Sequence, residues 1–172
     1  DTTFLLQFSE SMDVASLIAT NFSFSSGIAV ENVTLQDAFG YEVMVEISAP
    51  YTAGILHSLT LNSIRDCAGN ALSNNSFEFA KGRMPLAYEL IITEIMAKPT
   101  PSEGLPEVEY VEILNTSSDI ISLENVVLAD LVGSSRLKDQ ILSPGEYLVL
   151  APNSGADQLP GSMGLFNWPN LN

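Results

Sequence analysis

The feature that most constrains this chain is a rhythm of short apolar runs separated by turn residues. The runs are rich in β-branched and aromatic side chains, and Gly, Pro, Asn, Asp and Ser lie between them. The clearest run is 41–47 (YEVMVEI), where Tyr41, Val43, Val45 and Ile47 fall on one face of a strand. Segments with a helical period are nearly absent. The pattern therefore predicts an all-β sandwich in which one face of each strand is buried.

The same signals predict further strands on both sides of a break near residue 81. They are 4–8, 21–24, 30–35, 58–64, 76–79, 89–96, 108–115, 120–123, 126–131 and 147–151. One helical turn is expected at residues 13–17, with Asp13 as its N-cap.

The alternation stops at residues 81–85 (KGRMP), where a glycine, a proline and two of the six basic residues gather. We therefore predict two sandwich domains in tandem, residues 1–81 and 88–172, joined by a linker at 82–87. Three prolines in residues 98–106 predict an exposed loop of polyproline character in the second domain.

The net charge of the chain excludes some classes of binding partner. The chain has 21 acidic and 6 basic residues and a net charge of -15, so it repels nucleic acid and anionic membranes. No apolar run approaches the roughly 20 residues of a membrane span, which predicts no membrane insertion. Cys67 is the one cysteine, so neither an intrachain disulfide nor a Cys-rich zinc site can form.

The first half contains a string of motifs in a fixed order. They are 8–13 (FSESMD), 16–17 (SL), 21–22 (NF), 64–70 (IRDCAGN) and 77–79 (FEF). In order and spacing this string resembles the bacterial Ig-like domains of the SbsA type. The resemblance implies an Ig-like sandwich of the kind found in surface-layer and other cell-envelope proteins. His57 stands where such domains usually carry a tyrosine.

The second half contains a different string. It consists of 92–96 (ITEIM), Pro99, 109–115 (EYVEILN), Leu123, 128–130 (LAD) and 142–150 (LSPGEYLVL). This string resembles the lamin-tail domain, an Ig-like sandwich of bacterial extracellular proteins and nuclear lamins. Asn125 and Val126 depart from the glycine and aromatic residue common in that family. Coiled-coil heptads are absent, which argues against a nuclear lamin. Together the two resemblances imply two tandem Ig-like β-sandwich domains.

Both ends suggest that the native polypeptide continues. The first domain lacks an opening strand before Thr2, and the second stops at 168–172, where lamin-tail domains usually continue into a closing hairpin. An open sheet edge on each sandwich is therefore expected.

Catalytic combinations are scarce. His57 is the one histidine, and it lies in phase with Leu59 and Leu61, which favours a core or rim position. Cys67 is interpreted as a small filler within the turn 66–70. The sequence has no GxSxG elbow and no phosphate-binding glycine loop. The chain is therefore predicted not to be an enzyme.

Polar loop residues have structural interpretations. Glu10, Asp13, Asp66 and Asn70 are expected to cap turns and to form Asx-type hydrogen bonds. Gly69 is expected to supply a positive φ angle.

Carboxylates are the one group with a possible metal role. Glu94, Glu109 and Glu112 lie on or beside two neighbouring strands, where like charges need a cation between them. Calcium is the natural candidate because it binds carboxylate oxygens. A basic side chain would neutralise the glutamates equally well, the candidates being Lys98, Arg136 and Lys138. A glycosidase acid and base pair is less favoured, since no feature indicates a cleft.

Three aromatic residues near the end of the chain, Phe166, Trp168 and Tyr147, are candidates for a ligand contact. Trp168 and Phe166 in particular would form a platform on which a sugar stacks. A place in the core or in a frayed terminus explains the same residues at least as well.

These observations predict a non-catalytic extracellular or cell-surface module of a bacterial protein. It would serve as a spacer, a presentation scaffold or an adhesion domain, with other domains of the same polypeptide, a surface protein or a glycan as partner. The alternative is a carbohydrate- or protein-binding accessory module of a larger secreted hydrolase or nuclease. Its contact would be the loop at 99–106 or the aromatic tail.

Overall fold

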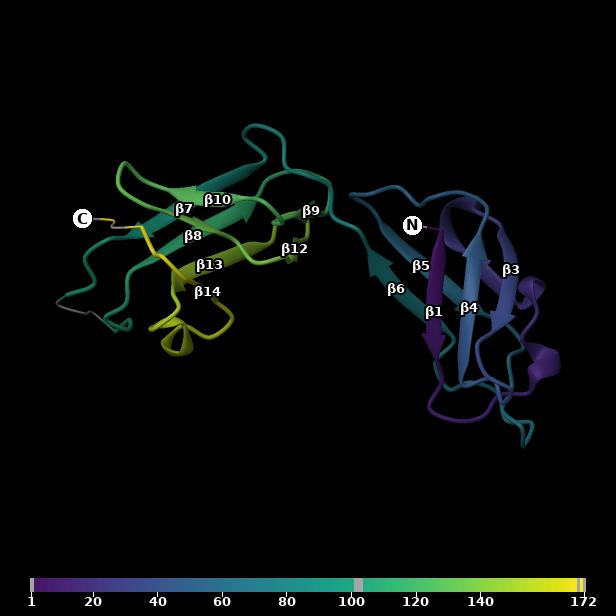
Figure 1. Cartoon of the computed structure of the whole chain (residues 1–172). Coiled ribbons are helices and arrows are strands. Elements are labelled where there is room, and N and C mark those ends of the chain that lie inside the picture. Colours follow the sequence, from purple (N-terminus) through teal and green to yellow (C-terminus); the bar gives the residue numbers. More distant parts are fainter. Residues whose placement is uncertain (1, 101–103, 170, 172) are drawn as a thin grey trace. The chain divides into compact units, whose positions relative to one another are not determined.

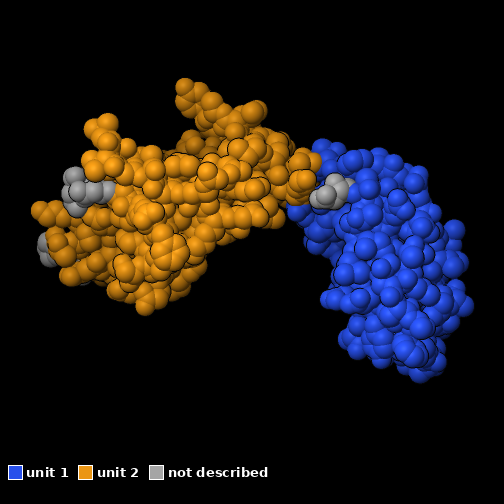
Figure 2. Space-filling view, viewed as in Figure 1, with its two compact units in different colours: residues 1–52, 56–80 blue, residues 53–55, 81–172 orange. Residues whose placement is uncertain are grey.

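The computed structural model describes residues 2–100, 104–169 and 171. The chain divides into two compact units (Figure 2): unit 1 is residues 1–52 and 56–80, and unit 2 is residues 53–55 and 81–172. Strands and short 3₁₀ turns make up the regular structure in the described ranges (Figure 1). The predicted all-β fold class is confirmed.

In its described residues, 2–52 and 56–80, unit 1 contains six strands and three 3₁₀ turns. The strands are β1 (Thr3–Gln7), β2 (Phe22–Phe24), β3 (Val30–Leu35), β4 (Glu42–Ile47), β5 (Leu56–Leu61) and β6 (Ser76–Ala80). The turns are η1 (Val14–Ser16), η2 (Ala19–Asn21) and η3 (Ser25–Gly27). Asp13 caps η1 as predicted, since its Oδ1 accepts a hydrogen bond from Ala15 N at 3.0 Å.

Two three-stranded sheets form unit 1, in the orders β1-β4-β3 and β2-β5-β6. Val43, Val45 and Ile47 of β4 are buried together with residues of β2 and β5, so the core lies between the two sheets. Tyr41, expected on the same buried face, is 43% exposed, because β4 begins one residue later at Glu42.

The part of unit 2 that the structure describes contains eight strands and one 3₁₀ turn. The strands are β7 (Leu90–Met96), β8 (Tyr110–Asn115), β9 (Ile121–Ser122), β10 (Val127–Ala129), β11 (Ser134–Arg136), β12 (Ile141–Leu142), β13 (Tyr147–Pro152) and β14 (Met163–Leu165). The turn is η4 (Ala156–Gln158). β11, β12 and β14, each two or three residues long, were not predicted.

The main sheet of unit 2 has the order β14-β13-β8-β7, and the ribbons β10-β11 and β12-β9 complete the fold (Figure 1). β13 pairs antiparallel with β8 and parallel with β14. The core of unit 2 contains buried side chains of the main sheet and of the ribbon β12-β9. Among them are Ile113 of β8, Leu150 of β13, Leu142 of β12 and Ile121 of β9.

In the described residues, strand β7 lies at the edge of the main sheet. A bulge falls between Ile92 and Glu94, and Ile92 and Ile95 are 50% and 55% exposed. In the described part of unit 2, β7 therefore forms an open edge of the main sheet, and the open edge expected at the end of the second domain stays a prediction.

The beginning of unit 2 runs alongside β9. Arg83 N donates to Ile120 O at 3.1 Å, and Ser122 N donates to Arg83 O at 2.8 Å. Gly82 lies so close to β9 that a Cβ atom on it would come within 2.4 Å of Ser122 N. Residues 82 and 83, which belong to the predicted linker, thus lie in unit 2 and pair with it.

Replacing Gly82 by Ala should destabilise unit 2 by about 2 to 3 kcal/mol, because the added methyl group meets backbone atoms that cannot move independently. Chemical denaturation measures this change. Gly133→Ala is the matched control, since the nearest atom to its added Cβ is 3.7 Å away. Equal stabilities for the two variants would contradict the close approach.

Candidate functional site

Two glutamates face each other across strands β7 and β8. Glu94 pairs in register with Glu112 because the bulge at Thr93 shifts β7 by one residue. Each carboxylate accepts a hydroxyl hydrogen bond: Tyr110 Oη donates to Glu94 Oε1, and Thr93 Oγ1 donates to Glu112 Oε1, both at 2.6 Å. The two hydroxyl donors stabilise like charges that strand pairing by itself would oppose.

The phenol of Tyr110 is part of the same cluster. The hydrogen bond to Glu94, burial of the ring and the charges of Glu94 and Glu112 together raise the pKa of Tyr110 to about 12. Tyr110 therefore stays protonated at neutral pH and remains a hydrogen-bond donor to Glu94.

Glu109 lies apart from this pair. It accepts a hydrogen bond from Trp168 Nε1 at 3.0 Å, and Trp168 packs against the core of unit 2. Three positions separate Glu109 from Glu112, and an odd separation places side chains on opposite faces of a strand. In residues 2–100, 104–169 and 171, no three His, Cys, Asp or Glu side chains gather closely enough to hold a metal. Calcium binding stays a prediction, with Glu94 and Glu112 as the glutamates that lie together.

The basic side chains considered as neutralising partners lie elsewhere. Lys98, Arg136 and Lys138 form no ion pair with a carboxylate in the described part of the chain. Hydroxyl donors therefore take the place that a cation was expected to fill between Glu94 and Glu112.

The aromatic candidates have different surroundings. Trp168 is partly buried against the core, whereas Phe166 is 67% and Tyr147 56% exposed. No ring contact joins Phe166 to Trp168 in the described structure. Phe166 is thus the more accessible of the two predicted ligand contacts. Of the proline-rich loop, residues 101–103 lie outside the described residues.

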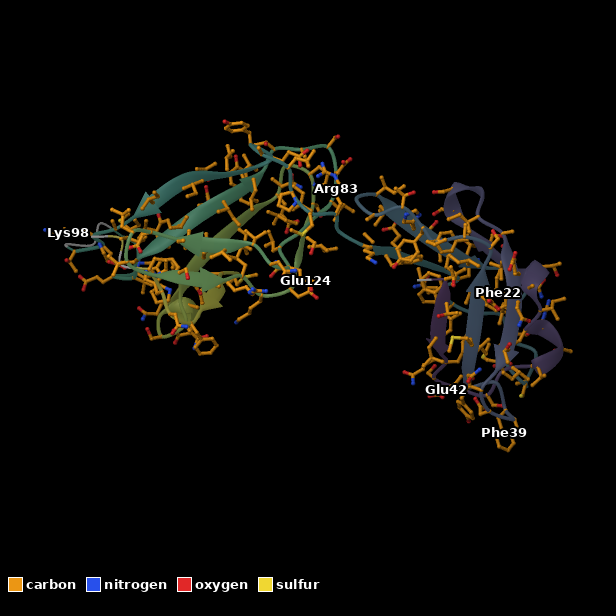
Figure 3. The ribbon with its side chains drawn as sticks, turned by 45° about the horizontal axis from the view of Figure 1, so that its top comes forward. Phe22, Phe39, Glu42, Arg83, Lys98 and Glu124 are labelled. Atoms are coloured by element: carbon orange, nitrogen blue, oxygen red, sulfur yellow. The ribbon has the colours of Figure 1, made fainter. Side chains whose placement is uncertain are left out.

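An ion-pair cluster centred on Arg83, which the sequence did not indicate, lies at the start of unit 2 (Figure 3). Arg83 donates from Nη1 and Nη2 to the two carboxylate oxygens of Glu89, each at 2.7 Å, and from Nε to Asp119 Oδ2 at 2.7 Å. Leu86 N also donates to Glu89. The hydrogen bonds from Arg83 and from Leu86 N lower the pKa of Glu89 from 4.5 to about 2.

This lowered pKa predicts a pH dependence of stability. Because Glu89 binds its proton less tightly in the folded state, its contribution is complete above pH 4.5 and is lost as pH falls towards 2. We expect the difference in unfolding free energy between the native chain and Glu89→Gln to shrink over this range. Chemical denaturation at pH 6, 4 and about 2.5 measures it. Glu124→Gln, at an exposed position (Figure 3), is the control, and an equal pH trend there would contradict the assignment.

His57 is a core residue of unit 1, as predicted. Its side chain is 1% exposed, and Leu59 and Leu61 of the same strand are buried on the same side. Cys67 was expected to be a filler, but it is exposed, and its Sγ lies 3.3 Å from Ser11 Oγ. The filler interpretation is wrong because the turn presents this position to solvent.

The turn at residues 66–70 has the predicted Asx-type geometry. Asp66 Oδ1 accepts hydrogen bonds from Ala68 N and Asn70 N at 2.8 Å, and Oδ2 accepts from Asn70 Nδ2 at 2.6 Å. These bonds, the side-chain bond from Asn70 above all, lower the pKa of Asp66. Gly69 has φ +88°, which confirms its predicted role.

Most of the second unit matches a known protein family. Residues 86–170 match the family model described as the Lamin Tail Domain. That stretch is therefore similar to lamin tail domains, and its all-β structure agrees with the Ig-like fold of that family. No curated protein matches the chain. In the described residues, no helix is both long enough and apolar enough to cross a bilayer.

Solved structures of surface-layer proteins are similar to the chain over most of its length. The N-terminal part of the bacterial S-layer protein SbsC has 18% identity and a TM-score of 0.42, covering 85% of this chain and 34% of that one. Domains 1–6 of the surface layer protein SbsC have 15% identity and a TM-score of 0.42, covering 87% and 30%. The chain thus spans about a third of the length of these proteins. The SbsA-type assignment of the first domain stays a prediction.

Proposed function

We propose that the chain is a non-catalytic structural and interaction module of a secreted or cell-surface bacterial protein. The observation that carries this proposal concerns the buried polar groups. In the described residues, no buried side-chain nitrogen or oxygen lacks a hydrogen-bond partner. These hydrogen bonds hold loops and strands in place, as expected of a module whose role is structural.

The residues with nucleophilic or basic side chains support the same conclusion. His57 is enclosed by three aromatic rings and is 1% exposed, so it cannot meet a substrate. Cys67 is exposed, and the polar side-chain atom 3.3 Å from its Sγ belongs to Ser11, which is not a base. A nucleophile with an adjacent base is therefore not formed by either residue.

The expected role is that of a spacer, a presentation scaffold or an adhesion domain outside the cell. The lamin tail domain and the SbsA-type motif string support an extracellular protein. The net charge of -15 favours solubility and keeps copies of the chain apart. The edge of β7, with Ile92 and Ile95 half exposed, supports contact with another domain of the same polypeptide.

Antibody labelling of the source bacterium tests the location. Antibodies raised against the folded chain should label intact cells or the culture medium without permeabilisation. An antibody against a cytoplasmic protein serves as the control for cell integrity. Labelling that requires permeabilisation would overturn the extracellular assignment.

A second candidate function is a saccharide-binding accessory module of a larger secreted hydrolase or nuclease. One feature favours it: a surface cavity beside the exposed ring of Phe166 in unit 2.

A further inference from the structure

A cavity of about 220 Å³ opens on unit 2 where β11 meets the segment that follows β14. Its lining combines basic, aromatic and small polar residues. They are Ser135, Arg136, Lys138, Gly164, Leu165, Phe166 and Asn167. The cavity thus joins two cations and an exposed aromatic ring on one surface of an acidic chain.

The backbone around the cavity is fixed. Ser135 is 4% exposed, and its hydroxyl donates to the carbonyl oxygen of Phe166. Lys138 N donates to Met163 Sδ at 3.4 Å. The ring of Phe166, 67% exposed, is therefore held at the surface by its backbone instead of by burial of its side chain.

The two cations point to the same side. Leu137 is buried in the core, and Arg136 and Lys138 flank it, so alternation directs both basic side chains outwards. Neither forms an ion pair with a carboxylate of the described residues, although the chain has 21 acidic residues. Arg136 uses Nη1 to donate to Asn125 Oδ1, which leaves its other N–H groups for a ligand.

We infer that this cavity binds the carboxylate of a uronic acid residue in an acidic saccharide. A guanidinium group presents a planar pair of donors that matches a carboxylate, and the ammonium group of Lys138 adds a second charge. The apolar face of a sugar ring stacks on an aromatic side chain, and Phe166 presents one beside the two cations. A neutral sugar would leave the cations unpaired, and a phosphate ion would leave the ring unused. The inference rests on the proposed function only in that it places the chain where saccharides occur.

Titration of the whole chain with a galacturonic acid trisaccharide tests the inference, followed by ¹H–¹⁵N NMR. We expect saturable shift changes at residues 135–138 and 164–167, and much weaker ones with the neutral galactose trisaccharide or with inorganic phosphate. Arg136→Gln and Lys138→Gln should each weaken binding about tenfold, because each removes a charge-assisted contact. Phe166→Ala should weaken it by a similar factor.

Two matched variants control for charge and for exposed aromatic area. Lys98→Gln removes the same charge from a loop of unit 2, and Phe39→Ala removes a ring of unit 1 that is 66% exposed (Figure 3). Both should leave the affinity unchanged. Equal binding of the neutral trisaccharide, equal shifts with phosphate alone, no shifts at millimolar ligand, or an equal loss in Lys98→Gln would each overturn the inference. Cell-surface labelling does not depend on this titration, so failure of the site and failure of the extracellular assignment are distinguishable.

Discussion

Replacing Asn115 by Asp should lower the stability of unit 2 by about 4 kcal/mol, the largest effect expected for a single substitution in this chain. Asn115 is fully buried, and its Nδ2 donates to the carbonyl oxygens of Asp119, Leu142 and Ser143 at 2.8, 2.9 and 3.1 Å. Its Oδ1 accepts hydrogen bonds from the backbone and hydroxyl of Ser117. An aspartate has nearly the same shape but places an oxygen against three carbonyl oxygens.

Thermal unfolding at pH 7 measures this effect, and the midpoint of unit 2 should fall by more than about 15 °C. Burial and the facing carbonyl oxygens favour the protonated form of the introduced carboxyl, so the loss should become smaller as pH is lowered towards 4. Asn75→Asp makes the same change at an exposed position of unit 1 and should shift the midpoint little. An unchanged midpoint for the Asn115 variant would show that this residue does not hold segments 117–119 and 142–143 together.

Replacing His57 by Ala should destabilise unit 1 by about 3 kcal/mol. The imidazole packs among Phe24, Tyr51 and Phe79, with ring centroids 5.6, 5.2 and 6.0 Å away. Its Nε2 lies 2.9 Å from the carbonyl oxygen of Thr52, which identifies this nitrogen as the donor. The substitution leaves a cavity among the rings and an unpaired carbonyl.

A second variant separates the two contributions. His57→Phe keeps an aromatic ring but removes the hydrogen bond to Thr52 and the 3.5 Å contacts of Nδ1 with the hydroxyls of Ser25 and Ser26, so it should cost about 1 to 2 kcal/mol. Chemical denaturation of both variants provides the comparison. Equal losses in the two variants would assign the stabilisation to the hydrogen bond and contradict the role of ring packing.

Strands with regular alternation could be predicted closely from the sequence. Residues 30–35 match β3 at both ends, and 147–151 differs from β13 by one residue. The alternation is a local property, so it is visible in the chain itself. β14 could not be predicted, because its three residues include Gly164 and its parallel pairing with β13 is set by contacts far apart in sequence.

The same distinction between local and long-range contacts holds for the turns and polar clusters. Turn chemistry at Asp66 and Gly69 was predicted correctly because it depends on neighbouring residues. The roles of Asn115 and Arg83 were missed, since their partners lie up to 36 positions away. Asn125 was noted only as a departure from the glycine that lamin-tail domains commonly have; the structure gives it φ +67°, a conformation that asparagine tolerates better than most residues.

Single-molecule force extension of the chain tests most directly the claim that it is a structural module. We expect two discrete unfolding events, one for each sandwich. Each event should lengthen the chain by roughly 25 to 30 nm, because about 80 to 90 residues extend at up to ~3.6 Å per residue. Smooth extension without separate events would show that the chain lacks two cooperatively folded sandwiches. That result would contradict the claim that the chain is a structural module.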